Sequence, residues 1–152
     1  MLSFVNIRGL YLDSKILYKS ESYSVFIKKE EYDSFIKLDK YIQNNIKPDE
    51  SIIVAPEGQL FNVINNKKWD FYNSTFTPLD FQTFGDDFMI KQLEKYKINY
   101  VIFYPRNTID YGFEILCRDY GVDFCRYVRD NYYRIDDLNR YNIEIYKKNY
   151  EK

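Results

Sequence analysis

Two short, largely apolar runs, residues 51–55 and 100–104, dominate the pattern of hydrophobic and polar positions along the chain. Each run ends at a proline that is followed by polar residues. Runs of this length without alternation are typical of strands that are covered on both faces of a sheet. We therefore predict two buried strands, each ending in a polar turn.

Helical spacing appears between and beside these runs. Residues 30–47 have an acidic start and are followed by Pro48, and their apolar residues recur at intervals of three and four: Phe35, Leu38, Ile42 and Ile46. A short helix is predicted at residues 59–65, and a longer one starts at Asp86, with Ile90, Leu93 and Tyr96 on its apolar stripe. Residues 113–116 and 122–131 are predicted as further helices. Residues 69–84 are aromatic-rich and contain Pro78, and we expect them to form an irregular connection.

Three more strands complete the predicted order. Residues 23–28 and 132–135 are rich in β-forming residues, and residues 141–146 alternate in the manner of a half-exposed, antiparallel edge strand. Strands that alternate with helices predict an α/β layered fold with a mostly parallel open sheet of Rossmann-like topology and an antiparallel edge. Residues 1–22 are interpreted as a lead-in or linker with short strands at 4–7 and 10–12, and residues 23–152 as one domain.

The composition argues against several classes of function. The formal net charge is −1, from 22 basic and 23 acidic residues, so we expect no nucleic-acid partner. The pairs Lys28-Lys29 and Lys67-Lys68 are interpreted as solvated surface. The aromatic content of 20% invites a sugar-stacking platform in the irregular connection, but packing in the core is favoured. The residues concerned are Phe71, Tyr72, Phe76, Phe81 and Phe84.

The chain has no histidine, which removes the commonest general base and the commonest metal ligand. Its two cysteines, Cys117 and Cys125, cannot form a zinc site by themselves. We favour two buried free thiols, since on one continuous helix they would be ~12 Å apart. A disulfide requires a sharp turn at residues 119–121. We expect no metal site.

The candidate binding residues follow the two apolar runs. Glu57 and Gln59 come after the first run, and Arg106 and Asn107 come after the second. If the two strands are parallel neighbours, Glu57 and Arg106 face one crevice, where α/β sheets usually bind ligands. An ion pair that only anchors two loops uses the same residues, and we favour that reading over ligand binding.

No complete catalytic constellation occurs in the chain. Neither GxGxxG nor GxxxxGK[ST] is present, so we expect no nucleotide cofactor and predict no catalytic residue. Carboxylates are plentiful, but Asp86, Asp87 and Asp123 suit helix starts and Asp136-Asp137 suits a turn. No run approaches the ~18 apolar residues of a membrane span, and the first twelve residues do not resemble a signal peptide, so we expect this fragment to be soluble.

The order of motifs resembles the soluble C-terminal domain of polytopic membrane glycosyltransferases, the class of dolichyl-phosphate-mannose–protein mannosyltransferases and lipid-A aminoarabinose transferases. The likeness runs from about Tyr41 to Lys147. It rests on Tyr41-Ile42, Lys47-Pro48-Asp49-Glu50, Val54-Ala55-Pro56-Glu57-Gly58, Phe61-Asn62, Asn99-Tyr100-Val101-Ile102, Asp119-Tyr120-Gly121, Asn131-Tyr132 and Ile143-Glu144-Ile145-Tyr146-Lys147. Asn62 joins the candidate binding residues through this run. The chain departs from the family at residues 63–67, where Lys67 or Lys68 is available to replace the charge of a family arginine.

The resemblance implies an accessory domain on the extracytoplasmic face of a membrane enzyme that uses a polyprenyl-phosphate sugar donor. The family's catalytic acidic residues lie in the membrane part, so this chain is expected to be inactive in isolation. Its expected partners are that membrane part and a glycan or polyprenyl-linked sugar. The alternative is a free-standing α/β binding or interaction module. A small enzyme that uses carboxylates without histidine is the third hypothesis, and it needs two of those carboxylates to converge.

Overall fold

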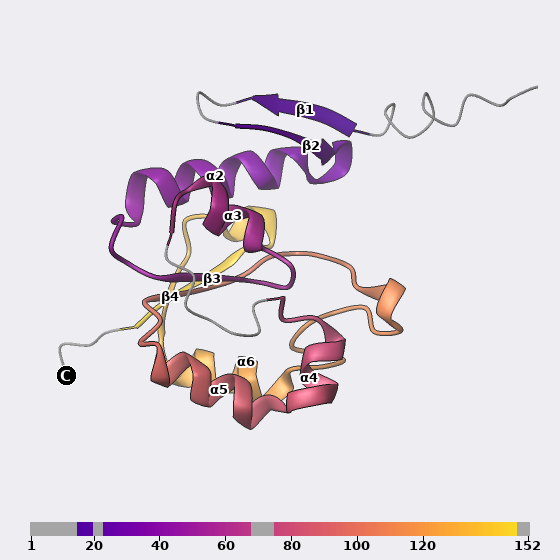
Figure 1. The fold of residues 1–152 in the computed structure, drawn as a ribbon, viewed down its shortest axis with the longest axis vertical. Helices are drawn as coiled ribbons and strands as arrows, with labels where there is room; N and C mark the ends of the chain where they lie inside the picture. Colours follow the sequence, from indigo (N-terminus) through magenta and orange to yellow (C-terminus); the bar gives the residue numbers. More distant parts are fainter. Residues whose placement is uncertain (1–14, 20–22, 68–74, 149–152) are drawn as a thin grey trace, which may run out of the picture.

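Both apolar runs form strands at the centre of the molecule, β3 (Ile52–Ala55) and β4 (Tyr100–Phe103), and every residue of both is buried. We describe the protein from a computed structural model, which describes residues 15–19, 23–67 and 75–148. The two strands pair in parallel at the middle of the layered arrangement in Figure 1. The sheet continues with β6 (Glu144–Lys147) and β5 (Tyr133–Ile135), in the order β3-β4-β6-β5.

The predicted α/β class is confirmed, but the prediction of a mostly parallel sheet is wrong. Only the β3–β4 pairing is parallel, whereas β4–β6 and β5–β6 are antiparallel. The reason is that the chain after residue 131 returns through two short strands rather than through another helical crossover. Antiparallel pairing allows that short return, since parallel neighbours need a long connection.

The strand predicted at the edge lies inside the sheet. The antiparallel direction of β6 is correct, but β6 sits between β4 and β5, and β5 forms the edge. Ile145 and Tyr146 are both buried, one in each of the two apolar clusters on the two faces of the sheet. The alternation of residues 141–146 therefore does not mark an exposed face, because α6 (Val122–Asn131) contributes to the cluster that includes Tyr146.

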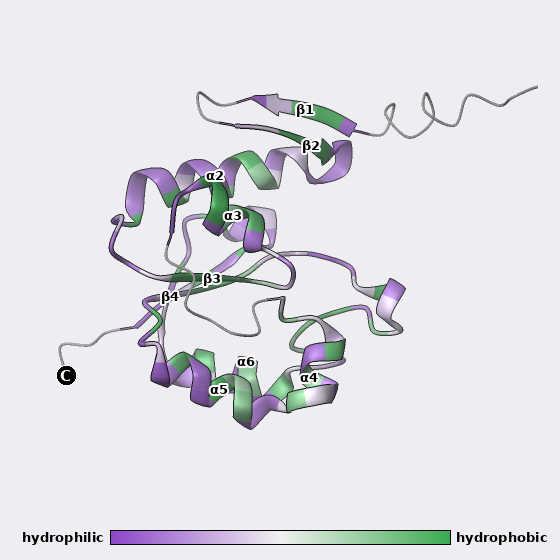
Figure 2. Ribbon diagram, viewed as in Figure 1, coloured by the Kyte–Doolittle hydropathy of each residue, from purple (hydrophilic) through white to green (hydrophobic). Residues whose placement is uncertain are grey.

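Helices cover both faces of the sheet, and their apolar sides point towards it (Figures 1 and 2). On one face lie α2 (Tyr32–Asn45), preceded by the 3-10 turn η1 (Lys29–Glu31), and α3 (Gln59–Ile64). The opposite face carries α4 (Pro78–Phe84), α5 (Asp86–Lys95) and α6. Short 3-10 turns η2 (Ile109–Tyr111) and η3 (Asn139–Tyr141) interrupt the loops after β4 and β5.

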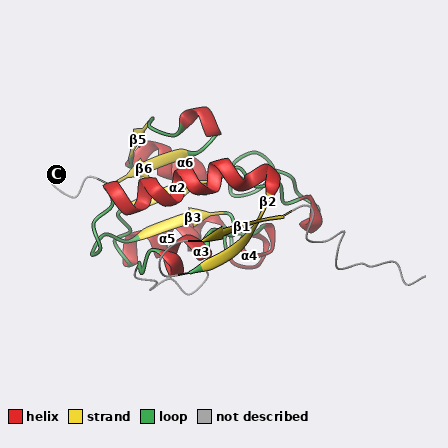
Figure 3. Ribbon diagram, turned by 90° about the horizontal axis from the view of Figure 1, so that it is seen from above, coloured by secondary structure: helices red, strands yellow, loops and turns green. Residues whose placement is uncertain are grey.

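A hairpin of β1 (Lys15–Lys19) and β2 (Ser24–Lys28) lies against α2, on the side away from the main sheet (Figures 1 and 3). The strand prediction for residues 23–28 is confirmed. Its partner β1 lies within residues 1–22, the segment that was interpreted as a lead-in, so part of that segment pairs with the domain. The short strands predicted at 4–7 and 10–12 lie outside the described residues.

Asp39 on α2 ties these elements together from a fully buried position. Its carboxylate accepts hydrogen bonds from the hydroxyls of Tyr18 and Tyr23, at 3.1 and 2.6 Å, and from the amides of Gln43 and Asn65, at 3.1 and 2.9 Å. Donors from the hairpin, from α2 and from the residue after α3 thus converge on one side chain. We call this set the Asp39 centre.

The helix periodicities are largely confirmed. The four residues of the predicted stripe on α2 are all buried, and α6 spans the predicted residues, with Cys125 and Val128 inward. Residues 113–116 are not helical, and α4 lies where an irregular connection was predicted. Thr77 and Asp80 form a capping box around Pro78, which therefore starts this helix rather than interrupting it.

The predicted pair of free thiols is wrong, because Cys117 and Cys125 form a disulfide. Residues 117–120 form a turn before α6 begins, which brings the two Cα atoms to 5.4 Å. Gly121 permits this turn, since its φ is 61° and a side chain there would press on Leu116 and Phe81. The disulfide therefore joins the loop before α6 to the helix itself.

The two lysine pairs that were predicted to be solvated differ in the structure. Lys28 and Lys29 are exposed as predicted, but Lys67 is buried, with 8% of its surface exposed. Its ammonium group donates to the carbonyl groups of Ile46 and Lys47, at 2.8 and 2.5 Å, and so satisfies the end of α2. Burial lowers the pKa of Lys67. Lys68 lies outside the described residues.

The favoured packing role of the aromatic residues holds for two of the three that can be placed. Phe76 and Phe81 are buried, with ring centroids 5.3 and 5.5 Å from that of Phe124. Phe84 is 41% exposed and stacks on Phe88. Phe71 and Tyr72 lie outside the described residues. Phe76 and Phe81 therefore form part of the core beneath α4 and do not form an exposed aromatic platform with Phe84.

Candidate functional site

The turn after β3 holds Glu57 in an uncommon backbone conformation. Its φ is 54°, in the left-handed region that residues other than glycine seldom adopt. The N–H of Gly58 donates to the carbonyl of Val54 at 3.0 Å, and a side chain at Gly58 would overlap with Val54. The N–H of Glu57 donates to the carbonyl of Thr75 at 2.6 Å. The backbone thus fixes where the carboxylate of Glu57 points.

Glu57 and Arg106 meet, as the sequence predicted for parallel neighbouring strands. The Nε–H of Arg106 donates to Oε2 of Glu57, and the hydroxyl of Tyr111 donates to Oε1 at 2.5 Å. The two charged side chains are about one quarter and one fifth exposed, at 26% and 20%. Burial lowers the pKa of Arg106, but the charge of Glu57 and its hydrogen bond outweigh this, so that pKa is raised. The hydrogen bond to Glu57 is the main reason why the pKa of Tyr111 is raised.

The other three predicted binding residues have separate surroundings. Asn62 is buried and donates to the carbonyl of Ile52 at 2.9 Å, which fastens α3 to β3. Asn107 lies on the rim, where its side-chain oxygen accepts from the N–H of Ile109 at 2.8 Å. Gln59 begins α3, and its amide nitrogen is buried without a hydrogen-bond partner among the described residues. The structure therefore brings together Glu57 and Arg106, places Asn107 beside them and gives Asn62 a packing role.

A cavity of about 390 Å³ opens beside Arg106 at the end of β4. This volume lies within the range of small-molecule sites, whose lining is mostly apolar with a few polar groups. We call it the carboxyl-edge cleft, and its lining residues are Phe103, Tyr104, Pro105, Arg106, Asn107, Ile115, Leu116, Cys117, Arg129, Asn142 and Glu144. A hollow of about 140 Å³ shares Tyr104 and Arg106 with it and also includes Glu57. Arg106 therefore stands between the two.

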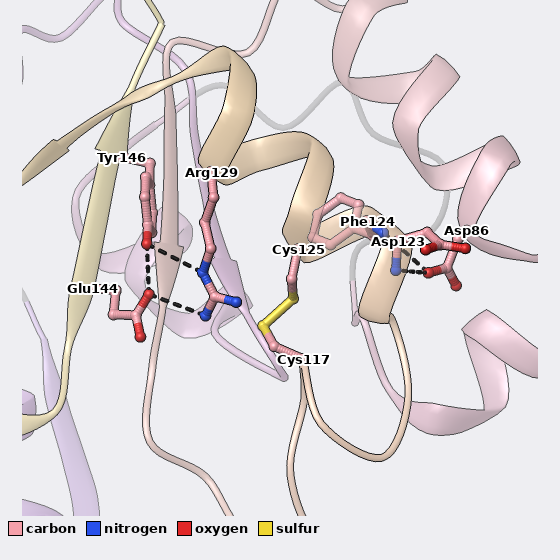
Figure 4. The surroundings of a disulfide bond; sticks show 8 residues. All are labelled: Asp86, Cys117, Asp123, Phe124, Cys125, Arg129, Glu144 and Tyr146. Atoms are coloured by element: carbon pink, nitrogen blue, oxygen red, sulfur yellow. Dashed lines mark hydrogen bonds and ion pairs between the residues drawn. A yellow bond between two sulfur atoms is a disulfide. The ribbon is translucent and has the colours of Figure 1, made fainter.

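A second pair of charged side chains, Arg129 and Glu144, also lines the cleft. Arg129 on α6 donates from Nη2 to Glu144 at 3.3 Å, and the hydroxyl of Tyr146 donates to the same carboxylate at 2.6 Å (Figure 4). Burial lowers the pKa of Arg129, but its hydrogen bond with Tyr146 and the charge of Glu144 leave it raised. Burial, and then Glu144, raise the pKa of Tyr146. Three side chains from two elements thus hold one another in place.

The disulfide forms the adjoining wall. Figure 4 shows Cys117 and Cys125 between Arg129 and the start of α6, where Asp86 accepts the N–H groups of Asp123 and Phe124 at 2.7 and 3.0 Å. Asp86, at the start of α5, therefore caps α6, and the disulfide links the loop of residues 115–117 to α6. These two links fix the position of α6, and with it that of Arg129.

Sequence reasoning missed Arg129, Asn142 and Glu144. The register explains why Asn142 and Glu144 belong to the site: Glu144 lies opposite Phe103, so the beginning of the antiparallel β6 reaches the same edge as the end of β4. Arg129 reaches this edge from α6 and donates to Glu144. Had β6 been parallel to β4, its beginning would lie at the other edge. No signal in the sequence specified that β6 pairs with β4, so the proximity of these residues could not be predicted.

The polar side chains at this edge can recognise a ligand through hydrogen bonds. Within the described ranges no three His, Cys, Asp or Glu side chains are grouped so that they could hold a metal ion. Glu57, in the neighbouring hollow, and Glu144, in the cleft, are each already bound to an arginine and a tyrosine. Among all the residues that the structure describes, no helix has the length and apolar character needed to cross a membrane.

Comparison of the chain with models of protein families, with curated proteins and with solved structures finds no match in any of the three. The interpretation of the carboxyl-edge cleft accordingly rests on its geometry.

Proposed function

We propose that this chain is a non-catalytic binding module that holds a small polar ligand in the carboxyl-edge cleft. We further propose that it serves as an accessory, extracytoplasmic domain of a membrane glycosyltransferase that uses a polyprenyl-phosphate sugar donor. Its partners are then the membrane part of that enzyme and a glycan or polyprenyl-linked sugar. In this proposal the chain has no catalytic activity in isolation.

One observation carries the binding role. Arg106 is held by Glu57 at the junction of two parallel strand ends and lines a cavity of small-molecule size. The left-handed conformation of Glu57 adds support, because strained backbone in proteins concentrates at functional sites. Tyr111 supports the same carboxylate from the loop after β4, so the pair is braced from two sides.

The context of the larger enzyme has two supports. The first is the resemblance of residues 41–147 to the C-terminal domains of that class, which includes the Pro56-Glu57-Gly58 turn. The second is the disulfide between Cys117 and Cys125, since disulfides persist mainly in oxidising, extracytoplasmic compartments.

The placement is tested in the source cells with an antibody raised against this domain. The proposal predicts that the antibody detects a membrane-bound polypeptide with a mass well above 18.6 kDa. It also predicts that protease added outside the intact membrane removes the epitope. Detection of the protein in the soluble fraction with a mass near that of this chain would refute the membrane context and leave the binding role standing.

A free-standing binding module of α/β type is the second candidate. It rests on the same cleft and needs no membrane partner. The two candidates share the binding role and differ in the partner. The fractionation experiment separates them.

A further inference from the structure

The charges around the carboxyl-edge cleft balance one another. Arg106 is paired with Glu57, and Arg129 is paired with Glu144 at 3.3 Å. Each guanidinium lies beside a carboxylate, and an arginine side chain stays charged near neutrality. A ligand that enters the cleft therefore meets two ion pairs rather than an excess of either sign.

Each ion pair leaves hydrogen-bonding capacity unused. Arg106 is bound through Nε, and within the described residues its two terminal nitrogens have no hydrogen-bond partner. On the same basis Nη1 of Arg129 and Oε1 of Glu144 are unbound. Figure 4 shows that the unbound nitrogen of Arg129 points away from Glu144, towards the side of the disulfide. The side-chain amide of Asn142, which also lines the cleft, likewise makes no hydrogen bond to another described residue.

The cleft thus offers fixed donors beside at least one fixed acceptor. A hydroxyl group both donates and accepts, so neighbouring hydroxyls of one ligand can bind an arginine and a glutamate at the same time. A carboxylate can only accept, and either a carboxylate or a phosphate would approach Glu144 against like charge. An apolar ligand would leave the paired arginines desolvated without new hydrogen bonds.

The remaining surface of the cleft is apolar. Phe103 and Leu116 are buried beneath it, and Ile115 is 43% exposed on the loop that forms its outer wall. Such a surface suits the C–H face of a saturated ring, which loses little hydration when it is covered. The combination of apolar walls with planar, pre-positioned polar groups selects a compact ring over an extended chain.

We propose that the carboxyl-edge cleft binds an uncharged, saturated ring with neighbouring hydroxyl groups, and that Arg129 and Glu144 together recognise one such pair of hydroxyls. This inference rests on the proposed binding role and names the class of ligand. Arg129 acts through its planar fork, which a lysine at the same position cannot reproduce although it keeps the charge.

The test is a titration of the isotopically labelled chain followed by two-dimensional amide NMR. The probes are myo-inositol and methyl β-glucopyranoside, into the tens of millimolar range. Cyclohexanol, a ring of the same size with one hydroxyl, and inorganic phosphate serve as comparison ligands. We expect both polyols to shift the amide signals of residues 103–104, 106–107, 115–117 and 142–144, and the two comparison ligands to bind more weakly by about tenfold.

Two variants on α6 form a matched pair. Arg129→Lys is expected to weaken polyol binding about tenfold, because a lysine cannot hold Glu144 and Tyr146 and at the same time present a fixed N–H to the ligand. Arg126→Lys, also on α6 and paired with Asp123 at 2.8 Å, is expected to leave it unchanged. Asn142→Gly is a further variant, since Asn142 has a φ of 56° that glycine adopts freely, and it should weaken binding severalfold.

The contrary outcomes are distinct. Phosphate binding that depends on Arg129, without polyol binding, would overturn the ligand class and leave the cleft as a binding site. Equal affinity for cyclohexanol and the polyols would overturn the role of paired hydroxyls. If no probe shifts the signals of the cleft, both this inference and the proposed binding role at the cleft fail. Polyol binding that Arg129→Lys leaves intact would refute the assignment to Arg129.

Discussion

Asp39 and Glu57 are two carboxylates that both accept hydrogen bonds from tyrosine hydroxyls, but their surroundings are very different. Asp39 is fully buried, and four neutral donors from the hairpin, α2 and the end of α3 surround it. Glu57 is one fifth exposed, and its partners are the cation of Arg106 and the hydroxyl of Tyr111. One lies between packed elements, and the other lies at the mouth of a cavity.

This difference in surroundings indicates different roles: Asp39 stabilises the fold, and Glu57 is placed to support ligand binding. The donors around Asp39 come from elements that must come together for the domain to fold, so the free energy of that centre goes into stability. At Glu57 the partner still has unused N–H groups and faces the cleft, so the pair can be used for recognition. Substitutions at the two centres should therefore move different observables.

The largest effect is expected at the Asp39 centre. Asp39→Ala leaves the hydroxyls of Tyr18 and Tyr23 and the amide of Asn65 without their acceptor, and should lower the free energy of unfolding by about 3 kcal/mol. Urea denaturation followed by circular dichroism measures it. Asp33→Ala, at an exposed position on the same helix, is the control and should cost less than about 1 kcal/mol. Equal losses in the two variants would show that the buried network does not stabilise the fold.

The next effect concerns the disulfide behind the cleft. Replacing both Cys117 and Cys125 by alanine should lower the free energy of unfolding by about 2 to 3 kcal/mol, since the bond closes a loop with a sequence separation of 8. The same loss should appear in the wild type when reductant is added during urea denaturation, whereas the double variant should not respond to reductant. Insensitivity of the wild type to reductant would contradict this account.

Alkaline pH should distinguish the tyrosines of the two centres. Burial, followed by the hydrogen bond to Asp39, raises the pKa of Tyr23 above its ordinary value of 10.0. Because the folded-state pKa is the higher one, this contribution to stability is complete below pH 10.0 and is lost as the pH rises above it. Tyr41 and Tyr120, whose pKa burial raises to about 12, add a loss between pH 10.0 and about 12.

The comparison uses Tyr23→Phe against Tyr111→Phe. The first should flatten the fall in the free energy of unfolding above pH 10.0, and the second should leave the slope near that of the wild type, because Tyr111 is exposed and its pKa depends mainly on Glu57. Urea denaturation at a series of pH values up to about 11 provides the slopes. A steeper or unchanged slope for Tyr23→Phe would count against the Asp39 centre as its cause.

The smallest effect on stability is expected at the edge of the cleft. Glu57→Gln removes the charge partner of Arg106 and should cost about 1 kcal/mol or less, since partly exposed ion pairs contribute little. It should nevertheless weaken ligand binding in the NMR titration, because Arg106 loses the carboxylate that positions it. Glu114→Gln, which breaks a pair with Arg118 whose side chains are 52% and 55% exposed, is the control and should change neither. A Glu57→Gln variant that binds as well as the wild type would leave the pair with an anchoring role only.

Patterns that depend on neighbouring residues in the chain were readable from the sequence. The stripe of α2, the extent of α6 and the two buried strands follow from periodicity, and their burial is confirmed. The helix α4 was missed although its signal was present: Thr77 and Asp80 stand at the spacing of a capping box, and Pro78 suits a first helical position. That error came from reading proline as a break.

Pairing across long sequence separations was not readable in the same way. Nothing in residues 141–146 tells whether they lie at an edge or between two strands, since alternation describes one strand and not its neighbours. The disulfide required knowledge of the turn at Gly121, and the partners of Asp39 lie up to 26 residues away.

The sequence by itself determined the α/β class and the two central strands, and it placed Glu57 and Arg106 just beyond their ends, because strand ends follow directly from local patterns. Only the tertiary structure decided that β6 lies beside β4, and with it that Glu144, Asn142 and Arg129 reach the same edge. The physical reason is that register and neighbour choice are set by how the apolar surfaces of the whole chain pack at once. A residue's own neighbours in sequence carry little of that information.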